Sequence, residues 1–376
     1  MSSDITVTEV ETGRHLDRFI KLPFALYRGD SNWVPPLISE RRDFFNKNKN
    51  PFFRGARTKL FLVSRAGTDI GRIATCINFN HNDFHDERVG FFGFFDCVDD
   101  FEVASRLLKV AMITIKSEGM DKMRGPADFS TNHEVGFLIE GFDQPPAVMM
   151  PYNPPYLPRL AERFGLKKVM DMYAFLLTDE EAIPERQMKI VNRIRERSKI
   201  RIRSADFGRL DQEIKVIRQV YNRAWERNWG FVPMREDEFY HMGRALKDIA
   251  DPELVLIAEI DSEPVAFAMG IPNINEVLIG MNGRLFPTGI FKLLWNMKIR
   301  RKIRGIRVMT LGVVDKYRRR GIDNILYAEL YERGIRRGYR WAEMSWVLET
   351  NELMCRAASN MGGRIYKKYR MVEMPI

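Results

Sequence analysis

The segment with the clearest chemical potential is 311–324, which reads Leu-Gly-Val-Val-Asp-Lys-Tyr-Arg-Arg-Arg-Gly-Ile-Asp-Asn. An apolar run typical of a buried strand leads into a basic turn and then into an amphipathic helical pattern. The first N–H groups of a helix lack partners and attract anions. Three consecutive arginines, Arg318, Arg319 and Arg320, add fork-shaped donors that suit phosphate. Gly321 permits close approach of the backbone to a ligand. The pattern indicates a phosphate site, and a solvated basic loop is the alternative.

The elements that must position this turn follow a repeating order along the chain. In the first half we expect helices at 13–22 (stopped by Pro23), 101–119 and 153–164, and strands at 59–65, 70–78, 89–96, 122–128 and within 166–178. In the second half we expect strands at 200–204, 254–260, 264–270, 307–314, 341–348 and 363–373, and helices at 210–228, 237–249, 324–338 and 351–360. Alternating strands and helices with antiparallel hairpins predict an α/β fold with a mixed sheet in each half. The predicted domains are 1–178 and 200–376, joined by a linker helix at 179–199.

Composition bounds the class of protein. The 376 residues are 45% hydrophobic and 29% charged, as expected of a folded protein with two or three domains. No apolar run approaches the roughly 18 residues that span a bilayer, and the start has no basic region before an apolar stretch. Three distant cysteines and the absence of an HExxH pattern argue against disulfides and a metal site. We therefore expect a cytoplasmic protein without a metal cofactor.

The charge favours an anionic partner. The net charge is +10, and basic residues concentrate at 189–203 and 298–307. A phosphate-bearing cofactor, a nucleic acid or an anionic lipid would each suit this balance. Solvated helix faces explain such runs equally well, so composition alone does not choose among these partners.

The strand, turn and helix at 311–324 resemble the acyl-CoA-binding motif of the GNAT superfamily of N-acyltransferases, Arg/Gln-x-x-Gly-x-Gly/Ala between the fourth strand and the next helix. Arg318 and Gly321 match the motif, whereas Asp323 stands where Gly or Ala is usual and could act as the helix N-cap. The resemblance covers about 200–373 and, more weakly, 1–178. It implies tandem GNAT-like folds and an acyl-CoA-dependent N-acyltransferase.

The same resemblance implies a set of cofactor contacts. In such enzymes the fourth and fifth strands splay apart, the pantetheine arm pairs with the fourth strand, and a backbone N–H polarises the thioester carbonyl. The cofactor would be acetyl-CoA or a longer acyl-CoA, bound without a metal. The implied contacts are Leu311, Gly312, Val313, Arg318, Arg319, Arg320, Gly321, Ile322, Asp323 and Asn351.

The catalytic groups implied by the resemblance are incomplete in this sequence. The usual acid is a tyrosine seven residues after Asn351, but Ala358 occupies that position. Tyr366, Ser359 or water is left as the acid that protonates CoA, unless the thiolate leaves unassisted or the protein is not catalytic. Glu349, at the end of the fifth strand, is the candidate base, and an exposed loop carboxylate is its alternative.

The first half lacks the binding loop. Residues 96–102 contain four acids, which would repel a pyrophosphate, so we expect a single CoA site in the second half and a degenerate first half. Asn132 and His133 of the first half and Trp229 of the second are expected to line an acceptor pocket, although ordinary packing explains each of them as well.

The acceptor and the partners stay open at this point. The aromatic stretches and the amphipathic segment 289–303 favour a bulky or amphiphilic amine and contact with an anionic membrane. A non-catalytic acyl-CoA or lipid-binding module and a tRNA-dependent aminoacyl transferase are the alternatives. No recognisable nucleic-acid-binding module is present, so we do not expect nucleic acid as a partner.

Overall fold

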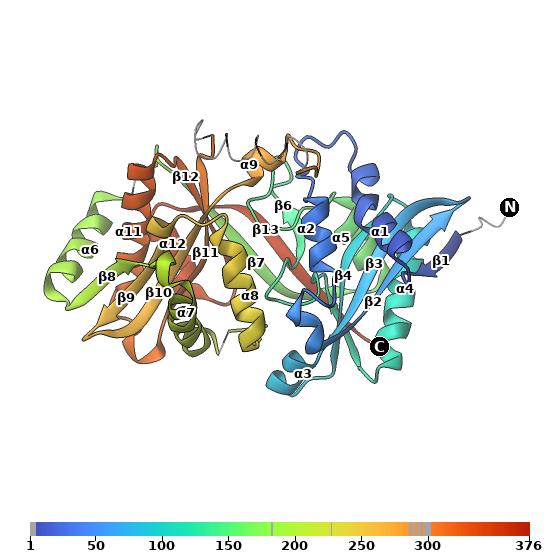
Figure 1. Cartoon of the computed structure of the whole chain (residues 1–376), viewed down its shortest axis with the longest axis horizontal. Coiled ribbons are helices and arrows are strands. Elements are labelled where there is room, and N and C mark those ends of the chain that lie inside the picture. The colour runs from blue at the N-terminus through green and yellow to red at the C-terminus, as the bar shows by residue number, and fades with distance from the viewer. Residues whose placement is uncertain are drawn as a thin grey trace. The chain divides into compact units, whose positions relative to one another are not determined.

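The computed structural model divides the chain into two compact units. The structure describes residues 5–181, 183–226, 228–285 and 302–376, with positions 289, 291 and 295. Unit 1 comprises Met1–Asp171, Leu278–Leu293 and Lys367–Ile376, and unit 2 comprises Met172–Val277 and Leu294–Tyr366. The last residues of the chain therefore belong to the unit that its first residues build (Figure 1).

The sheet of unit 1 is mixed. Its order is β1 (Ile5–Glu9), β2 (Ala56–Arg65), β3 (Thr68–Asn78), β4 (Val89–Cys97), β5 (Lys122–Gly125) and β13 (Arg364–Pro375), with β6 (Phe137–Glu140) also paired to β13. β4 and β5 run parallel, and the remaining pairs are antiparallel. A parallel pair needs a crossover, which helix α4 (Phe101–Ser117) supplies.

The helices of unit 1 cover this sheet. They are α1 (Gly13–Leu26), α2 (Ile38–Phe44), α3 (Phe79–His85), α4 and α5 (Tyr156–Phe164). The predicted apolar face of α4 is confirmed, because Val103, Leu107 and Ile115 are fully buried. The predicted stop of the first helix at Pro23 is wrong, since α1 continues to Leu26 around this proline. The Pro23 carbonyl still accepts a bond from the Tyr27 N–H, which closes the last turn.

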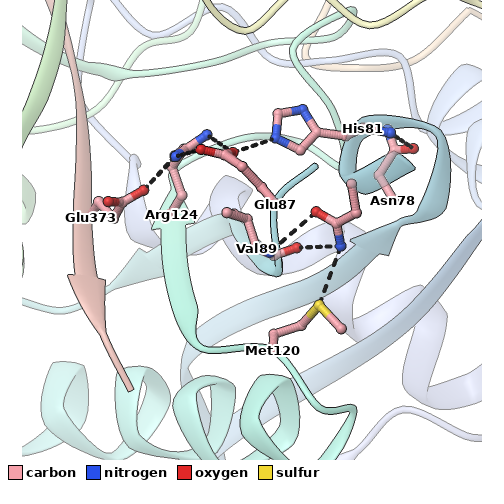
Figure 2. A network of polar contacts seen from close by, with 8 residues as sticks. Asn78, His81, Glu87, Val89, Met120, Arg124 and Glu373 are labelled. Atoms are coloured by element: carbon pink, nitrogen blue, oxygen red, sulfur yellow. Dashed lines mark hydrogen bonds and ion pairs between the residues drawn. The ribbon is translucent and has the colours of Figure 1, made fainter. Parts of the chain in front are cut away.

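A buried arginine attaches the C-terminal strand to unit 1 (Figure 2). Arg124 on β5 donates to Glu373 on β13 at 2.6 Å and to both oxygens of Glu87 at 3.0 and 3.2 Å. His81 Nε2 lies 3.2 Å from the same Glu87 carboxylate. Burial lowers the pKa of His81 to about 4, aided by the neighbouring His85, so this imidazole is neutral at pH 7.

Unit 2 has its own run of neighbouring strands, again of mixed direction. Its order is β7 (Lys167–Thr178), β12 (Trp341–Leu348), β11 (Gly305–Val313), β10 (Glu263–Pro272), β9 (Val255–Ile260) and β8 (Ile200–Ser204). Its helices are α6 (Glu185–Arg197), α7 (Leu210–Trp225), α8 (Glu236–Lys247), α9 (Asn275–Leu278), α11 (Ile322–Arg337) and α12 (Glu352–Asn360). β11 and β12 are parallel and joined by α11, as β4 and β5 are joined by α4 in unit 1.

Helices pack on both faces of the unit 2 sheet. α11 buries Ile322, Ile325 and Leu326 against one face, and α7 buries Ile217 and Val220 against the other. The predicted linker helix corresponds to α6, which packs against α11 through Arg195, bonded to Glu329 and Glu332 at 2.9 to 3.1 Å.

Among the described residues, no helix is long and apolar enough to cross a membrane. Most of the predicted amphipathic segment 289–303 lies outside the described residues, and Phe291 and Trp295 within it have exposed side chains.

Candidate functional site

The basic turn joins β11 to α11 as the sequence predicts. β11 ends at Val313, a 3-10 turn covers Asp315–Tyr317, and α11 begins at Ile322. Arg318 folds back onto the protein, because its guanidinium donates to the Val313 carbonyl at 3.2 Å and the Ala224 carbonyl at 2.6 Å. This arginine links the turn to the end of α7, although its side chain remains 41% exposed.

The next residues present the positive charge. Arg319 and Arg320 are exposed, and the Arg320 guanidinium lies 5.2 Å from the centre of the Tyr317 ring. Gly321 has φ +74°, and a Cβ there would approach Ile194 of α6 to 2.5 Å. Glycine adopts this left-handed conformation at the least steric cost, and Ile194 would have to shift to admit a larger residue.

Among the described residues, no side chain caps the start of α11. Gly321 is the N-cap residue and the structure shows no side-chain hydrogen bond at this position. The expectation that Asp323 could be the cap is wrong, because Asp323 lies inside the first turn, past the cap position. The first N–H groups of α11 are thus left to an external acceptor, which is the property that binds anions at helix N-termini.

β11 and β12 separate close to this turn. Their pairs run from Gly305–Trp341 to Val308–Met344, and no further pair follows among the described residues of the two strands. β11 continues to Val313 and β12 to Leu348, so their carboxyl ends diverge. The strand register therefore has the splayed arrangement that the resemblance implies.

A bulge in β11 decides which side chains share a face. Thr310 pairs with Met269 and Val308 with Gly270, so Met309 is the extra residue. Gly312 pairs with Phe267, which packs with α7. Because paired residues lie on one face of a sheet, Thr310 and Gly312 both face α7.

A charged network lies on this face where the strands begin to separate. Arg307 is 2% exposed and Glu343 is fully buried, with 4.0 Å between Arg307 Nε and the nearest carboxylate oxygen. Ser345 accepts from Arg307 at 3.1 Å and donates to Glu343 at 2.6 Å. Tyr366, from β13, donates its hydroxyl hydrogen to the other oxygen of Glu343.

Two polar atoms near the network have no hydrogen-bond partner within the part of the chain that the structure describes. They are the Thr310 hydroxyl on β11 and the Trp346 indole N–H on β12, both shielded from solvent. The Trp346 ring also stacks on the Arg307 guanidinium at 4.9 Å. An unpaired buried polar atom costs about 1–3 kcal/mol, so the separation of β11 and β12 presents groups that a ligand could satisfy.

An aromatic wall adjoins this face. Trp225 packs so closely on Gly312 that a Cβ there would lie 2.1 Å from the indole, and it stacks on Tyr221 with ring centres 4.9 Å apart. Phe231 and Phe239 contact Tyr221 in turn. Burial raises the pKa of the nearby Glu238 carboxyl to about 7.

The other predicted site residues of unit 2 belong to α12 and to the segments that follow β12 and α7. Asn351 is the N-cap of α12, and its side chain accepts from the Met354 N–H at 3.2 Å. Glu349 follows directly after β12, and Ala358 is fully buried in α12. Trp229 follows α7, in the segment after Trp225.

Asn132 and His133 belong to unit 1. His133 lies 3.0 Å from the Ser130 hydroxyl and between the rings of Phe44 and Phe52. Burial and the nearby Arg41 lower the pKa of His133 to about 4, which leaves it uncharged at pH 7.

The equivalent separation in unit 1 is filled by the chain itself. β4 and β5 also stop pairing early, after Phe91–Arg124. The Ala127 N–H then donates to the Phe92 carbonyl at 2.7 Å, and the Asp128 carboxylate accepts from the Phe94 N–H at 2.8 Å. The side chain of Asp100 caps α4.

Comparison with known proteins fits this geometry. No family model matches the chain. It is 38% identical to protein YghO of Escherichia coli over 96% of this chain and 93% of that protein. It is 36% identical to bacterial ceramide synthase of Caulobacter vibrioides over 99% of this chain and 98% of that one. The chain belongs to the family of YghO and bacterial ceramide synthase.

Solved structures show the same fold at low identity. A tandem GNAT protein from the clavulanic acid biosynthesis pathway matches with a TM-score of 0.59 and 10% identity, over 99% of this chain and 98% of that one. A GCN5-related N-acetyltransferase from Sphaerobacter thermophilus matches with a TM-score of 0.54 and 15% identity, over 98% and 95% of the two chains. The predicted tandem GNAT fold is confirmed, and with the family it makes the protein an N-acyltransferase.

Proposed function

We propose that the protein transfers a fatty acyl group from acyl-CoA to the amine of a long-chain, sphingoid-type base, forming a ceramide-like amide. A relative of nearly equal length, 36% identical, is named a ceramide synthase. The observation that carries the proposal is the uncapped start of α11 beside separating strands in unit 2.

CoA would bind at the basic turn. The pyrophosphate lies against the N–H groups of Gly321, Ile322 and Asp323, with charge from Arg319 and Arg320. The structure changes the predicted role of Arg318, because this arginine already binds two backbone carbonyls and so shapes the turn. The pantetheine arm would pair with Leu311, Gly312 and Val313, which have no strand partner on the β12 side.

The acyl acceptor would approach from the face that carries α7. Trp225 and Tyr221 offer apolar surface to an alkyl chain, and Thr310 and Trp346 offer unpaired polar atoms to its oxygen-bearing head. A long-chain amino alcohol combines these two kinds of surface. A small hydrophilic amine would leave the aromatic surface uncovered.

Contact with a membrane would bring such substrates to the enzyme. Phe291 is 73% exposed and Trp295 52% exposed, in a segment rich in lysine and arginine. Exposed aromatic side chains beside basic residues suit the interface of an anionic bilayer. We therefore propose peripheral binding at the cytoplasmic leaflet. Flotation with vesicles that contain anionic lipid should carry the protein upward, and vesicles of neutral lipid serve as the control.

Amide formation is the direct test of the enzyme. Purified protein is incubated with acetyl-, octanoyl- or palmitoyl-CoA and with sphinganine or a short alkylamine, and products are identified by mass spectrometry. We expect an amide from sphinganine and a long-chain acyl-CoA. Binding of acyl-CoA, seen as a rise in melting temperature, without any amide would instead support the non-catalytic binding module.

A further inference from the structure

We propose that Tyr366 and Glu343 form the proton relay that deprotonates the attacking amine. The inference rests on the proposed N-acylation and names the base that this reaction requires. Alkylamines titrate near pH 10, as lysine does, so most of the acceptor is protonated at neutral pH and cannot attack. Some group at the site must remove that proton.

Glu343 is the buried carboxylate at the site. It is fully buried on β12, and it belongs to the last pairs before β11 and β12 separate, since Arg307–Glu343 precedes Val308–Met344. Its position places it at the base of the separation, on the face that also carries Thr310. A carboxylate this deep cannot contact the acceptor itself, so a second group has to connect them.

Tyr366 provides that connection. Its hydroxyl donates to Glu343, and its side chain is only partly buried. A phenol that donates its hydrogen to a carboxylate keeps oxygen lone pairs that can accept another hydrogen. The geometry therefore suits a transfer in which Tyr366 takes a proton from the amine while its own proton passes to Glu343.

Arg307 and Ser345 hold the carboxylate in place. Arg307 lies 4.0 Å from Glu343 and 3.1 Å from the Ser345 hydroxyl, which itself donates to Glu343 at 2.6 Å. The guanidinium places a positive charge beside the buried carboxylate, and the serine hydroxyl fixes the orientation of its Oε1 atom. Arg307 and Ser345 are positioning residues, because they act through Glu343.

The proposed step balances in atoms and charge. The acceptor binds as the ammonium ion, and one of its protons moves to Tyr366 as the Tyr366 proton moves to Glu343. The neutral nitrogen then forms a bond to the thioester carbonyl carbon, the C–S bond breaks, and a second nitrogen proton moves to the departing CoA thiolate. The products are the amide and CoA–SH, and Glu343 returns its proton to water through Tyr366.

Tyr366→Phe is the decisive variant, because it removes one oxygen from the relay and leaves the ring. We expect kcat to fall about 100-fold or more, the usual scale of acid–base catalysis, with little change in KM for acyl-CoA. Tyr156→Phe in unit 1 is the matched control: its hydroxyl donates to the Cys97 carbonyl at 2.9 Å, and its loss should leave kcat unchanged.

The choice of acceptor separates proton removal from a structural role. A long-chain alkoxyamine has a nitrogen that is already unprotonated at neutral pH and needs less help from a base. The loss of kcat in Tyr366→Phe should shrink to about tenfold or less with this acceptor. A loss of equal size with both acceptors would overturn the relay, as would a Tyr366→Phe enzyme with wild-type kcat.

Glu343→Gln tests the second member of the relay. This variant should show the same dependence on the acceptor as Tyr366→Phe, and acyl-CoA should still raise its melting temperature as it does for the wild type. If Glu343→Gln fails to fold, Tyr366→Phe still decides the question. A wild-type protein that forms no amide would overturn the proposed function, whereas wild-type turnover with an unaffected Tyr366→Phe would overturn the relay alone.

Discussion

Each unit has one pair of parallel strands that stop pairing early, and the two units differ in what bonds to the backbone groups freed there. In unit 1, Ala127 and Asp128 return to bond the freed backbone of β4, and the ring of Phe129 packs among other aromatic rings beside them. In unit 2, the described residues of β11 and β12 make no such closure, and Thr310 and Trp346 are left with unpaired polar atoms.

The starts of the two crossover helices also differ in whether the chain satisfies their first N–H groups. Asp100 caps α4 with its own carboxylate and is paired with Arg65 at 2.7 Å, whereas α11 begins at a glycine beside exposed arginines. Unit 1 therefore satisfies its own freed backbone groups. We propose that unit 2 leaves the equivalent groups to a ligand, so that the repeated fold has one site.

The largest loss of stability should come from adding a methyl group to β4 where Ala127 and Asp128 bond to its backbone. A Cβ on Gly93 would lie 1.9 Å from the Ala127 carbonyl oxygen, so Gly93→Ala must displace backbone and should cost about 3 kcal/mol or more. In unit 2, Gly312→Ala meets the outer edge of the Trp225 ring, which is a side chain and can move. Urea denaturation should show the larger loss for Gly93→Ala. Equal losses would contradict the proposed difference between the two separations.

Acid should lower the stability of unit 1 through its buried histidines. The folded-state pKa of His81 is about 4, below the ordinary 6.5, so its stabilising contribution is complete above pH 6.5 and is lost as pH falls toward 4. We expect the wild type to lose about 1–3 kcal/mol more than His81→Gln over this range, as measured by denaturation at each pH.

His133 changes stability with pH in the same direction as His81. Asp128 changes it in the opposite direction, because burial and Glu134 raise the pKa of its carboxyl to about 7. Both residues are present in the wild type and in His81→Gln, so the difference isolates His81. His241→Gln, at an exposed position of unit 2, is the control for replacing a histidine by glutamine.

Reversing charge at the basic turn should weaken acyl-CoA binding without unfolding the protein. Arg319→Glu with Arg320→Glu should raise KM for acyl-CoA about tenfold, the scale of one or two phosphate contacts. Lys109→Glu, on the exposed side of α4, is the matched change in unit 1 and should leave KM unaltered. A similar rise in both proteins would show that net charge, rather than the turn, attracts CoA.

The smallest effect should be the loss of the α4 cap. Asp100 accepts from the Glu102 N–H at 2.9 Å, and Asp100→Ala should cost about 1 kcal/mol of stability. Calorimetry should detect a lower melting temperature, while KM for acyl-CoA stays that of the wild type. A higher acyl-CoA affinity or a second bound CoA would contradict the view that unit 1 has no cofactor site.

The sequence predicted the longer elements because each has a local signal, whereas the short elements β1, α2, α3 and β6 were not predicted. The periodic apolar residues of α4 and α11 and the turn at 318–321 identified the strand–turn–helix order without any tertiary information. The stop at Pro23 was wrong because a proline in the last turn of a helix displaces few hydrogen bonds.

The charged network was missed because it depends on strand register. Arg307 and Glu343 stand alone within apolar strands, and only the parallel pairing of β11 with β12 brings them together. A single charged residue in a buried strand was the available signal. The partner role of Tyr366 needed the third strand, β13, which no local pattern connects to Glu343.

The final strand also bears on how the protein is made. Residues 367–376 complete the sheet beside β5, and Glu373 neutralises the buried Arg124. While the ribosome is still synthesising unit 2, the nascent first unit therefore carries an exposed strand edge and an incompletely paired buried cation. Its sheet can close only after residues 367–376 are translated, so a stop before residue 367 would damage the part of the chain that is made first.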